Sequence, residues 1–306
     1  MTRILISEVG LRDGLQSIDR TMPTEAKKRW IAAEAAAGVR EIEVGSFVPP
    51  KLLPQMADTT ELVDFARGIE GLGVVALVPN AKGAQNAAKA GVHAMSLPFS
   101  MSETHSLKNV RKDHAAMLAE IAECASIARA ADIHFAVGLS TAFGCTMEGA
   151  VPQAQVVRLA VAAVEAGAQE LSLSDTTGYA DPAQVRRLTR AVRAEVGDAL
   201  LTTLHLHNTR GLGLANVVAG LEEGITTFDA SLGGLGGCPF APGASGNLVT
   251  EDLVLMLNAM GCDTGIDLDA LLKVRSIVEE ALPGEAMYGF TPDAGPMLDY
   301  MDRVAA

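Results

Sequence analysis

The sequence predicts an α/β protein, a (β/α)8 TIM barrel with a short C-terminal helical extension. Eight apolar, β-branched segments alternate with segments of helical periodicity along the 306 residues, and such alternation is typical of a parallel sheet. Glycines follow the helical segments in AAAG, AKAG, VEAG, LEEG and LNAMG, as expected for helix C-caps. A doubly wound open sheet is disfavoured, because GLRDG after the first strand does not match the dinucleotide-binding pattern GxGxxG.

The elements are expected at short intervals. Arg3–Val9 is apolar and ends at a glycine, which predicts a buried first strand, and Thr24–Gly38 has the capping residues of a helix. Seven further strands are expected at 40–46, 72–79, 94–98, 134–140, 170–175, 200–207 and 225–230. Seven further helices are expected at about 58–69, 81–90, 107–131, 153–166, 182–196, 211–223 and 248–260.

The tail after Gly261 is expected to add a helix at 267–281 and a less regular end, which would pack on the barrel or on another subunit. We predict a single domain over residues 1–306, with the barrel at about 1–260 and the helical extension at about 261–306. Barrels of this kind reach such a length as one unit.

Composition excludes several classes of protein. The net charge of −13 argues against nucleic acid and anionic membranes as partners, although a local basic rim for a phosphorylated ligand remains compatible with it. No apolar run approaches the roughly 20 residues that cross a bilayer. The four cysteines lack CxxC spacing and no signal peptide is recognised, so we expect a cytoplasmic protein.

A glycine-rich loop is expected between the eighth strand and the helix that follows it. Residues 233–246 include six glycines, two prolines and the single cysteine Cys238, which predicts a mobile loop that can fold over a neighbouring site. Thr250, Glu251 and Asp252 are expected to start the next helix. A plain connector is the alternative, but it would not need an embedded Cys238 and Asn247.

A divalent-metal site is predicted at the carboxyl ends of the strands, where TIM barrels carry their active sites. His205 and His207 are two residues apart on one strand, so both side chains face the same way. Asp13 after the first strand and Asn247 from the loop would add oxygen ligands. This donor set suits Mn²⁺ or Mg²⁺. A pair of hydrogen-bonded core histidines is the alternative.

Four further residues are candidates for chemistry. Arg12 would stabilise a developing oxyanion, or else form a surface ion pair. Glu43 and Asp175 interrupt apolar strands, so each is expected either behind the metal ligands or in acid–base catalysis. Cys238 would move a proton near the metal, or else be an inert thiol.

The order of these residues resembles the 3-hydroxy-3-methylglutaryl-CoA lyase family, part of a metal-dependent lyase and synthase superfamily with (β/α)8 barrels. The resemblance covers most of the chain and rests on EVGLRDGLQ (8–16), SFVPPKLLPQMAD (46–58), LVPN (77–80), FGCTMEG (143–149), LSLSDTTG (171–178), HLHNTRGLGLAN (205–216) and LGGLGGCPFAPGASGNLVTEDLVLML (232–257). The last segment is the most specific, because GGCP followed by GASGN and TED favours the lyases over isopropylmalate and homocitrate synthases.

The resemblance implies roles for these residues. Asp13, His205, His207 and Asn247 match the family's metal ligands, Arg12 its enolate-stabilising arginine and Cys238 its loop cysteine, while Glu43 and Asp175 fall at acidic active-site positions. It further implies a metal-assisted retro-Claisen cleavage of an acyl-CoA thioester to acetyl-CoA and a 3-oxo acid, a part in leucine degradation, and a homo-oligomer, dimer or tetramer.

Departures from the family pattern bear on the substrate. Ser17-Ile18-Asp19 replaces the usual Asn-Glu after LRDGLQ, Asn208 and Arg210 replace an acid and a tyrosine, and LPFSMSE (97–103) replaces a segment of small residues. Another 3-hydroxyacyl-CoA, such as citramalyl-CoA, is therefore an alternative substrate. A Claisen-type synthase or 2-oxo acid aldolase and a non-catalytic acyl-CoA binding barrel are further alternatives.

Overall fold

The computed structural model describes residues 2–236, 246–297 and 300 of the chain. Eight parallel strands form a closed barrel in sequential order, and the eighth strand pairs with the first. This confirms the predicted TIM barrel. The strands are β1 (Leu5–Glu8), β2 (Glu41–Ser46), β3 (Gly73–Leu77), β4 (Ala94–Ser100), β5 (His134–Ser140), β6 (Glu170–Ser174), β7 (Leu201–His205) and β8 (Thr227–Ala230).

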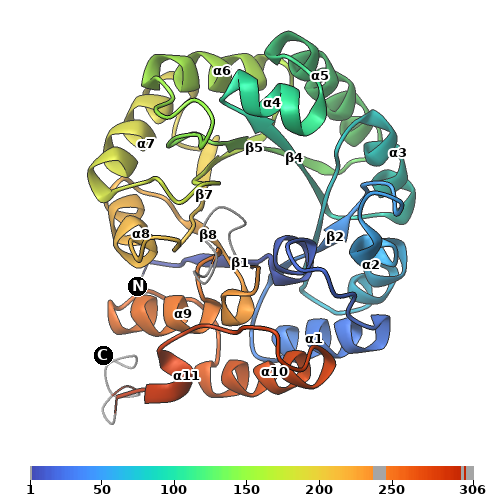
Figure 1. Ribbon diagram of the computed structural model, residues 1–306, viewed down its shortest axis with the longest axis vertical. Coiled ribbons are helices and arrows are strands. Elements are labelled where there is room, and N and C mark those ends of the chain that lie inside the picture. Colours follow the sequence, from blue (N-terminus) through green and yellow to red (C-terminus); the bar gives the residue numbers. More distant parts are fainter. Residues whose placement is uncertain (1, 237–245, 298–299, 301–306) are drawn as a thin grey trace.

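Helices form a ring around the strands, as Figure 1 shows. They are α1 (Thr24–Ala36), α2 (Thr59–Arg67), α3 (Ala81–Ala90), α4 (Glu103–Val110), α5 (His114–Ala130), α6 (Gln153–Glu165), α7 (Pro182–Val196), α8 (Gly213–Glu222), α9 (Thr250–Ala259), α10 (Leu268–Ala281) and α11 (Thr291–Ala294). The short turns η1 (Gly10–Gly14), η2 (Pro54–Met56) and η3 (Leu232–Gly234) lie between them. The core lies between the strands and these helices, with Trp30 of α1 completely buried in it.

The C-terminal extension packs on the barrel. Helix α10 contacts α1 and α9, and α11 contacts α9, so α10 lies beside the first helix although the chain between them is long (Figure 1). The tail was expected to pack on the barrel or on another subunit, and its described part packs on the barrel.

Two predicted element boundaries were wrong. The helix expected at 107–131 is two helices, because Arg111 has a left-handed backbone with φ 58° and Asp113 starts a new helix by accepting a hydrogen bond from the amide of Ala116. The strand expected at 200–207 ends at His205, and His207 instead forms an isolated bridge with Asn247.

Helix α9 starts at Thr250, as predicted, but the side chains of Thr250, Glu251 and Asp252 do not cap it. Val249 precedes α9 without a side-chain cap. The three side chains bind other parts of the chain instead: Thr250 donates to Glu8, Glu251 accepts from Arg275, and Asp252 accepts from the amides at the start of α11. Tertiary contacts have taken the place of the local cap.

Among the described residues, no helix has both the length and the apolar character needed to cross a membrane.

Candidate metal centre and active site

The first site residues lie on a tight turn that directly follows β1. This turn, η1, is a single turn of π-helix in which the amides of Arg12, Asp13 and Gly14 all point to the carbonyl oxygen of Val9, at 3.1, 2.7 and 3.3 Å. Such turns occur often at functional sites, because they re-aim the side chains they carry. The buried Glu8 fixes the turn, since its Oε1 accepts from the amide of Gly10 at 2.8 Å.

The same Glu8 joins this turn to the start of the glycine-rich loop. Its Oε1 also accepts from the amide of Leu232 at 3.0 Å, and its Oε2 accepts from the hydroxyl of Thr250 at 2.7 Å. Glu251 accepts a hydrogen bond from the next amide, that of Gly233, at 2.9 Å. Two loops that are more than 200 residues apart are therefore held by one buried carboxyl group.

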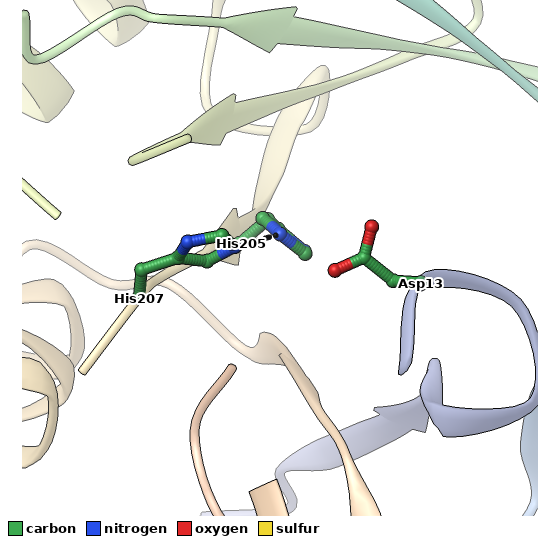
Figure 2. Close-up of side chains that lie close together, drawn as sticks. All are labelled: Asp13, His205 and His207. Atoms are coloured by element: carbon green, nitrogen blue, oxygen red, sulfur yellow. Dashed lines mark hydrogen bonds between the residues drawn. The ribbon is translucent and has the colours of Figure 1, made fainter. Parts of the chain in front are cut away.

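Asp13, His205 and His207 converge on one point at the mouth of the barrel, as Figure 2 shows. This candidate metal site is called the metal point below. One ligand atom from each residue lies within 4.8 Å of the others, and the Nε2 atoms of the two histidines are 3.1 Å apart. The geometry favours the metal-ligand interpretation over a pair of core histidines, because each of three donor atoms faces the other two.

Asn247 completes a set of four residues around this point. Its Nδ2 donates to Oδ2 of Asp13 at 2.8 Å and lies 3.4 Å from the carbonyl oxygen of Leu235. Its Oδ1 is buried and has no hydrogen-bond partner among the residues that the structure describes. A buried oxygen without a partner is costly, and a cation would satisfy it. The four predicted metal ligands thus lie together, and their oxygen and imidazole donors fit a divalent cation such as Mg²⁺ or Mn²⁺.

The charges around the point favour binding of a cation. Burial alone would raise the pKa of Asp13, but Arg12 and then the two histidines lower that pKa well below its usual range, so Asp13 is ionised. Burial lowers the pKa of His207 to about 4, and the neighbouring His205 lowers it as well, so this imidazole is neutral. An ionised carboxylate and a neutral imidazole are the forms that bind metal.

Asp229 on β8 orients one of the ligands, and sequence reasoning missed it. Its Oδ2 is 3.0 Å from Nδ1 of His205. Because a carboxylate only accepts, Nδ1 carries the proton and the lone pair on Nε2 is free to face the metal point. Burial would lower the pKa of His205, but the hydrogen bond that it donates to Asp229 raises the pKa overall. Like Glu43 and Asp175, Asp229 is an acid in an apolar strand, and that signal could have found it.

Arg12 is held by carboxylates on both sides. Its Nε donates to Oε2 of Glu43 at 2.5 Å and its Nη1 to Oδ1 of Asp13 at 2.5 Å. Burial would lower the pKa of Arg12, but Glu43 and Asp13 raise it above its usual value, so the charge is permanent. The other oxygen of Glu43 accepts from Ser96 at 2.6 Å. Glu43 therefore acts on the site by fixing the guanidinium of Arg12.

Asp175 lies at the end of β6 and is almost completely buried. Its Oδ1 accepts from the amides of Tyr179 and Ala180 at 2.7 and 3.1 Å, which shapes the loop after the strand. Its Oδ2 has no hydrogen-bond partner in the described part of the chain. Burial raises the pKa of Asp175 to about 6. Oδ1 of Asp175 thus stabilises the loop after β6, whereas Oδ2 makes no hydrogen bond with the described residues.

Neither Cys238 nor Arg210 is part of the site that the structure describes. Cys238 lies outside the described residues, so its position is not part of the site geometry. Arg210 donates to the carbonyl oxygens of Thr177 and Gly178 at 3.1 and 2.7 Å and lies over the ring of Tyr179 at 4.6 Å. It is absent from the cavity lining, so its guanidinium braces two loops. The expectation that Arg210 selects the substrate gains no support.

A cavity of about 440 Å³ opens beside the metal point and continues into the barrel. Its mouth is lined by Arg12, Asp13, Gln16, His105 and His207. The volume is in the range of small-molecule sites, so the barrel has room for a substrate next to the candidate metal ligands.

Comparisons with known proteins agree with this site. The sequence model of the HMGL-like family matches residues 3–278. The chain is 44% identical to hydroxymethylglutaryl-CoA lyase YngG of Bacillus subtilis, covering 92% of this chain and 93% of that protein. It is 39% identical to (R)-citramalyl-CoA lyase of Chloroflexus aurantiacus, covering 97% and 96%. A structure of an HMG-CoA lyase from Acinetobacter baumannii in complex with coenzyme A and 3-methylmalate is similar with a TM-score of 0.89 and 40% identity, covering 97% and 96%.

Proposed function

The chain belongs to the HMGL-like family and is a carbon–carbon lyase, and on that premise we propose that it cleaves 3-hydroxy-3-methylglutaryl-CoA, or a close 3-hydroxyacyl-CoA, to acetyl-CoA and a 3-oxo acid such as acetoacetate. The family inferred from the motifs is thereby confirmed. One observation carries the substrate proposal: Asp13, His205 and His207 meet within 4.8 Å, with the guanidinium of Arg12 bonded to the first of them.

Asp13, His205, His207 and Asn247 would hold the metal, which we take to be Mg²⁺ or Mn²⁺. When bound, such a cation supplies a Lewis acid that polarises substrate oxygens. The unpartnered Oδ1 of Asn247 and the ionised Asp13 support this assignment.

Arg12 stabilises the negative charge that appears on the thioester oxygen when the C2–C3 bond breaks. Its guanidinium is fixed by Glu43 and Asp13 before the substrate arrives, so little reorganisation is needed during the reaction. Preorganised charge of this kind is usually the largest contribution to catalysis.

We assign removal of the 3-hydroxyl proton to Asp175 rather than to Glu43. Both oxygens of Glu43 have partners, whereas Oδ2 of Asp175 has none among the described residues. Asp175 does not line the cavity, but it lies near enough to His205 for that residue to lower its pKa, so we assign it the role of a base that acts through one water molecule. Cys238 on the glycine-rich loop is our choice for delivering the proton to C2 of the nascent acetyl-CoA, as its match to the family's loop cysteine implies.

The test is release of acetyl-CoA from 3-hydroxy-3-methylglutaryl-CoA. We expect EDTA to abolish the release and Mg²⁺ or Mn²⁺ to restore it. Asp13→Ala removes a ligand and a partner of Arg12, so its kcat is expected to fall by about 10³-fold or more. The matched control is Asp19→Ala, an exposed aspartate close by in the chain, with activity close to that of the native protein. Full activity of Asp13→Ala would refute the proposal.

Citramalyl-CoA is the second candidate substrate. The relative from Chloroflexus aurantiacus named for this activity covers almost the entire chain, and this alternative predicts pyruvate as the second product. A higher kcat/KM for citramalyl-CoA in the same assay would favour it. Net condensation of acetyl-CoA with a 2-oxo acid would favour a synthase, and tight binding of CoA thioesters without turnover would favour a binding protein.

The proposal includes four broader properties. The family resemblance implies a homo-oligomer, a dimer or tetramer, and a part in leucine degradation, and the sequence predicts a cytoplasmic protein that forms a single domain over 1–306. Sedimentation equilibrium measures the oligomeric state, cell fractionation measures the location, and limited proteolysis should yield no stable fragment smaller than the barrel.

A further inference from the structure

The barrel is hollow on the side formed by β4, β5 and β6. TIM barrels are usually filled by layers of bulky branched side chains, but most of the residues of these three strands that line the cavity are small, the exceptions being Leu97, His134 and Glu170. The small residues are Ala94, Ser96 and Pro98 on β4, Ala136, Gly138 and Ser140 on β5, and Ser172 and Ser174 on β6. The cavity therefore extends past the metal point toward the opposite end of the barrel.

This hollow begins directly beside the candidate metal ligands. Ser174 is the register partner of His205, and Ser172 is the partner of Thr203 one layer deeper. Gly138 lies beside Ser172 on the next strand. An acyl group held at the metal point would therefore have open space next to it, lined by hydroxyl groups and by a residue without a side chain.

Neither the backbone conformation nor the packing at position 138 requires a glycine. A Cβ atom there would lie 3.4 Å from Oγ of Ser172 and 3.8 Å from Oγ of Ser174, with no other atom within 4 Å. By contrast, a Cβ at Gly10 would lie 2.5 Å from Oε1 of Glu8, so that glycine is required by its neighbours. Gly138 has no such requirement, and its effect is to enlarge the cavity.

The far end of the cavity is rich in carboxyl groups. Glu170 accepts from His134 at 3.0 Å and from Thr203 at 2.7 Å. Glu41 lies at the start of β2, where burial raises its pKa to about 7. Such an end would repel a second carboxylate and would accept hydrogen bonds from a hydroxyl group.

We propose that the hollow formed by β4, β5 and β6 is an extended acyl pocket, and that the lyase takes 3-hydroxyacyl-CoA thioesters whose substituent at C3 is several carbons longer than methyl and ends in a hydroxyl group. This inference rests on the proposed function. The chemistry is unchanged: the C2–C3 bond breaks, the hydroxyl proton goes to the base, the electron pair goes to the thioester and is protonated to acetyl-CoA, and the long substituent leaves on the ketone product.

The test compares thioesters that differ only in that substituent. We expect kcat/KM for a 4-hydroxybutyl substituent to be at least tenfold above that for methyl, with a carboxylate-terminated chain of equal length the poorest. Gly138→Leu should lower the ratio of long to short substrate at least tenfold, whereas Gly138→Ala, which adds one methyl group, should change the ratio much less. Ala136→Val tests the same pocket if Gly138→Leu does not fold, as judged by its melting curve.

Each result decides the inference. Cleavage of the methyl substrate without cleavage of the long one overturns the pocket and leaves the proposed function intact, and so does a ratio that neither variant changes. Preference for the carboxylate-terminated chain overturns the assigned terminal group. If no thioester is cleaved, the proposed function fails. Calorimetry with the same thioesters then tests the pocket by itself: if the thioester with the long substituent binds no more tightly than the methyl thioester, the pocket is refuted.

Discussion

At the residue scale, the site depends on side chains that hold other side chains. Glu43 fixes Arg12, and Asp229 fixes the tautomer of His205. Neither needs to contact a substrate to matter, because a ligand or a guanidinium that rotates freely must be ordered before it can act. The acids that interrupt the apolar strands thus have different tasks, although they look alike in the sequence.

The first prediction concerns Asp229. Asp229→Asn keeps the size of the side chain but replaces the charged acceptor of the His205 proton, so we expect Mn²⁺ to bind about 10- to 100-fold more weakly. Electron paramagnetic resonance of free Mn²⁺ measures the dissociation constant without any turnover. Asp19→Asn is the control, since Asp19 is exposed. If Asp229→Asn and the native protein bind Mn²⁺ with equal affinity, the carboxylate of Asp229 is not needed to orient His205.

At the scale of elements, a group of buried carboxyls joins β1, α1 and α9. Glu8, Glu34 and Glu251 are all buried, and both oxygens of Glu34 have no hydrogen-bond partner in the described structure. Burial raises the pKa of Glu8 to about 7. Burial, and then the nearby Glu8, raise the pKa of Glu34 well above its usual value. These groups retain protons in the folded chain at pH values where the unfolded chain has lost them.

The second prediction follows from that difference. Above pH 4.5 the unfolded chain ionises these groups while the folded chain keeps them protonated, so stability falls as the pH rises and levels off once the folded pKa values are passed. For Glu8 alone, the shift from 4.5 to about 7 corresponds to about 3 kcal/mol.

Glu34→Gln removes one titrating group and keeps its shape. We expect its unfolding free energy in urea to exceed that of the native protein increasingly from pH 5 to pH 9, because the raised pKa of Glu34 is removed. Glu195→Gln, an exposed change on α7, should show no such trend. A pH-independent difference for Glu34→Gln would mean that Glu34 is ionised throughout.

At the scale of the whole molecule, the metal point exists only when the barrel is closed. Asp13 follows the first strand, the histidines belong to the seventh strand and the turn after it, and Asn247 follows the eighth. Pairing of β8 with β1 brings the two ends of this set together. An unfolded chain therefore has no equivalent site, and we expect a cation to bind the folded state alone.

The third prediction is that the metal stabilises the entire fold. At a free Mn²⁺ concentration 100 times its dissociation constant, the unfolding free energy should rise by about 2.7 kcal/mol, which calorimetry detects as a higher Tm. In Asp13→Ala the increase should be largely lost, while Asp19→Ala should retain it. A rise of equal size in Asp13→Ala would place the stabilising cation elsewhere.

The sequence by itself determined the barrel and most of the site. Alternating apolar and helical segments with glycine at the helix ends are local patterns, and all eight strands lie where those patterns predicted them to within a few residues. The spacing of His205 and His207 and the motifs around Asp13 and Asn247 predicted four metal-ligand candidates that the structure places together, because residues at the carboxyl ends of barrel strands meet at one mouth.

Only the tertiary structure decided how the side chains pair. Nothing local shows that Thr250, Glu251 and Asp252 bind distant groups instead of capping α9, that Arg210 lies over Tyr179, or that Asp229 supports His205. The hollow beside β4, β5 and β6 likewise follows from the strand register, which places small residues of three strands in the same layers. Such pairings depend on contacts between residues far apart in the chain, and these contacts are fixed by closure of the barrel.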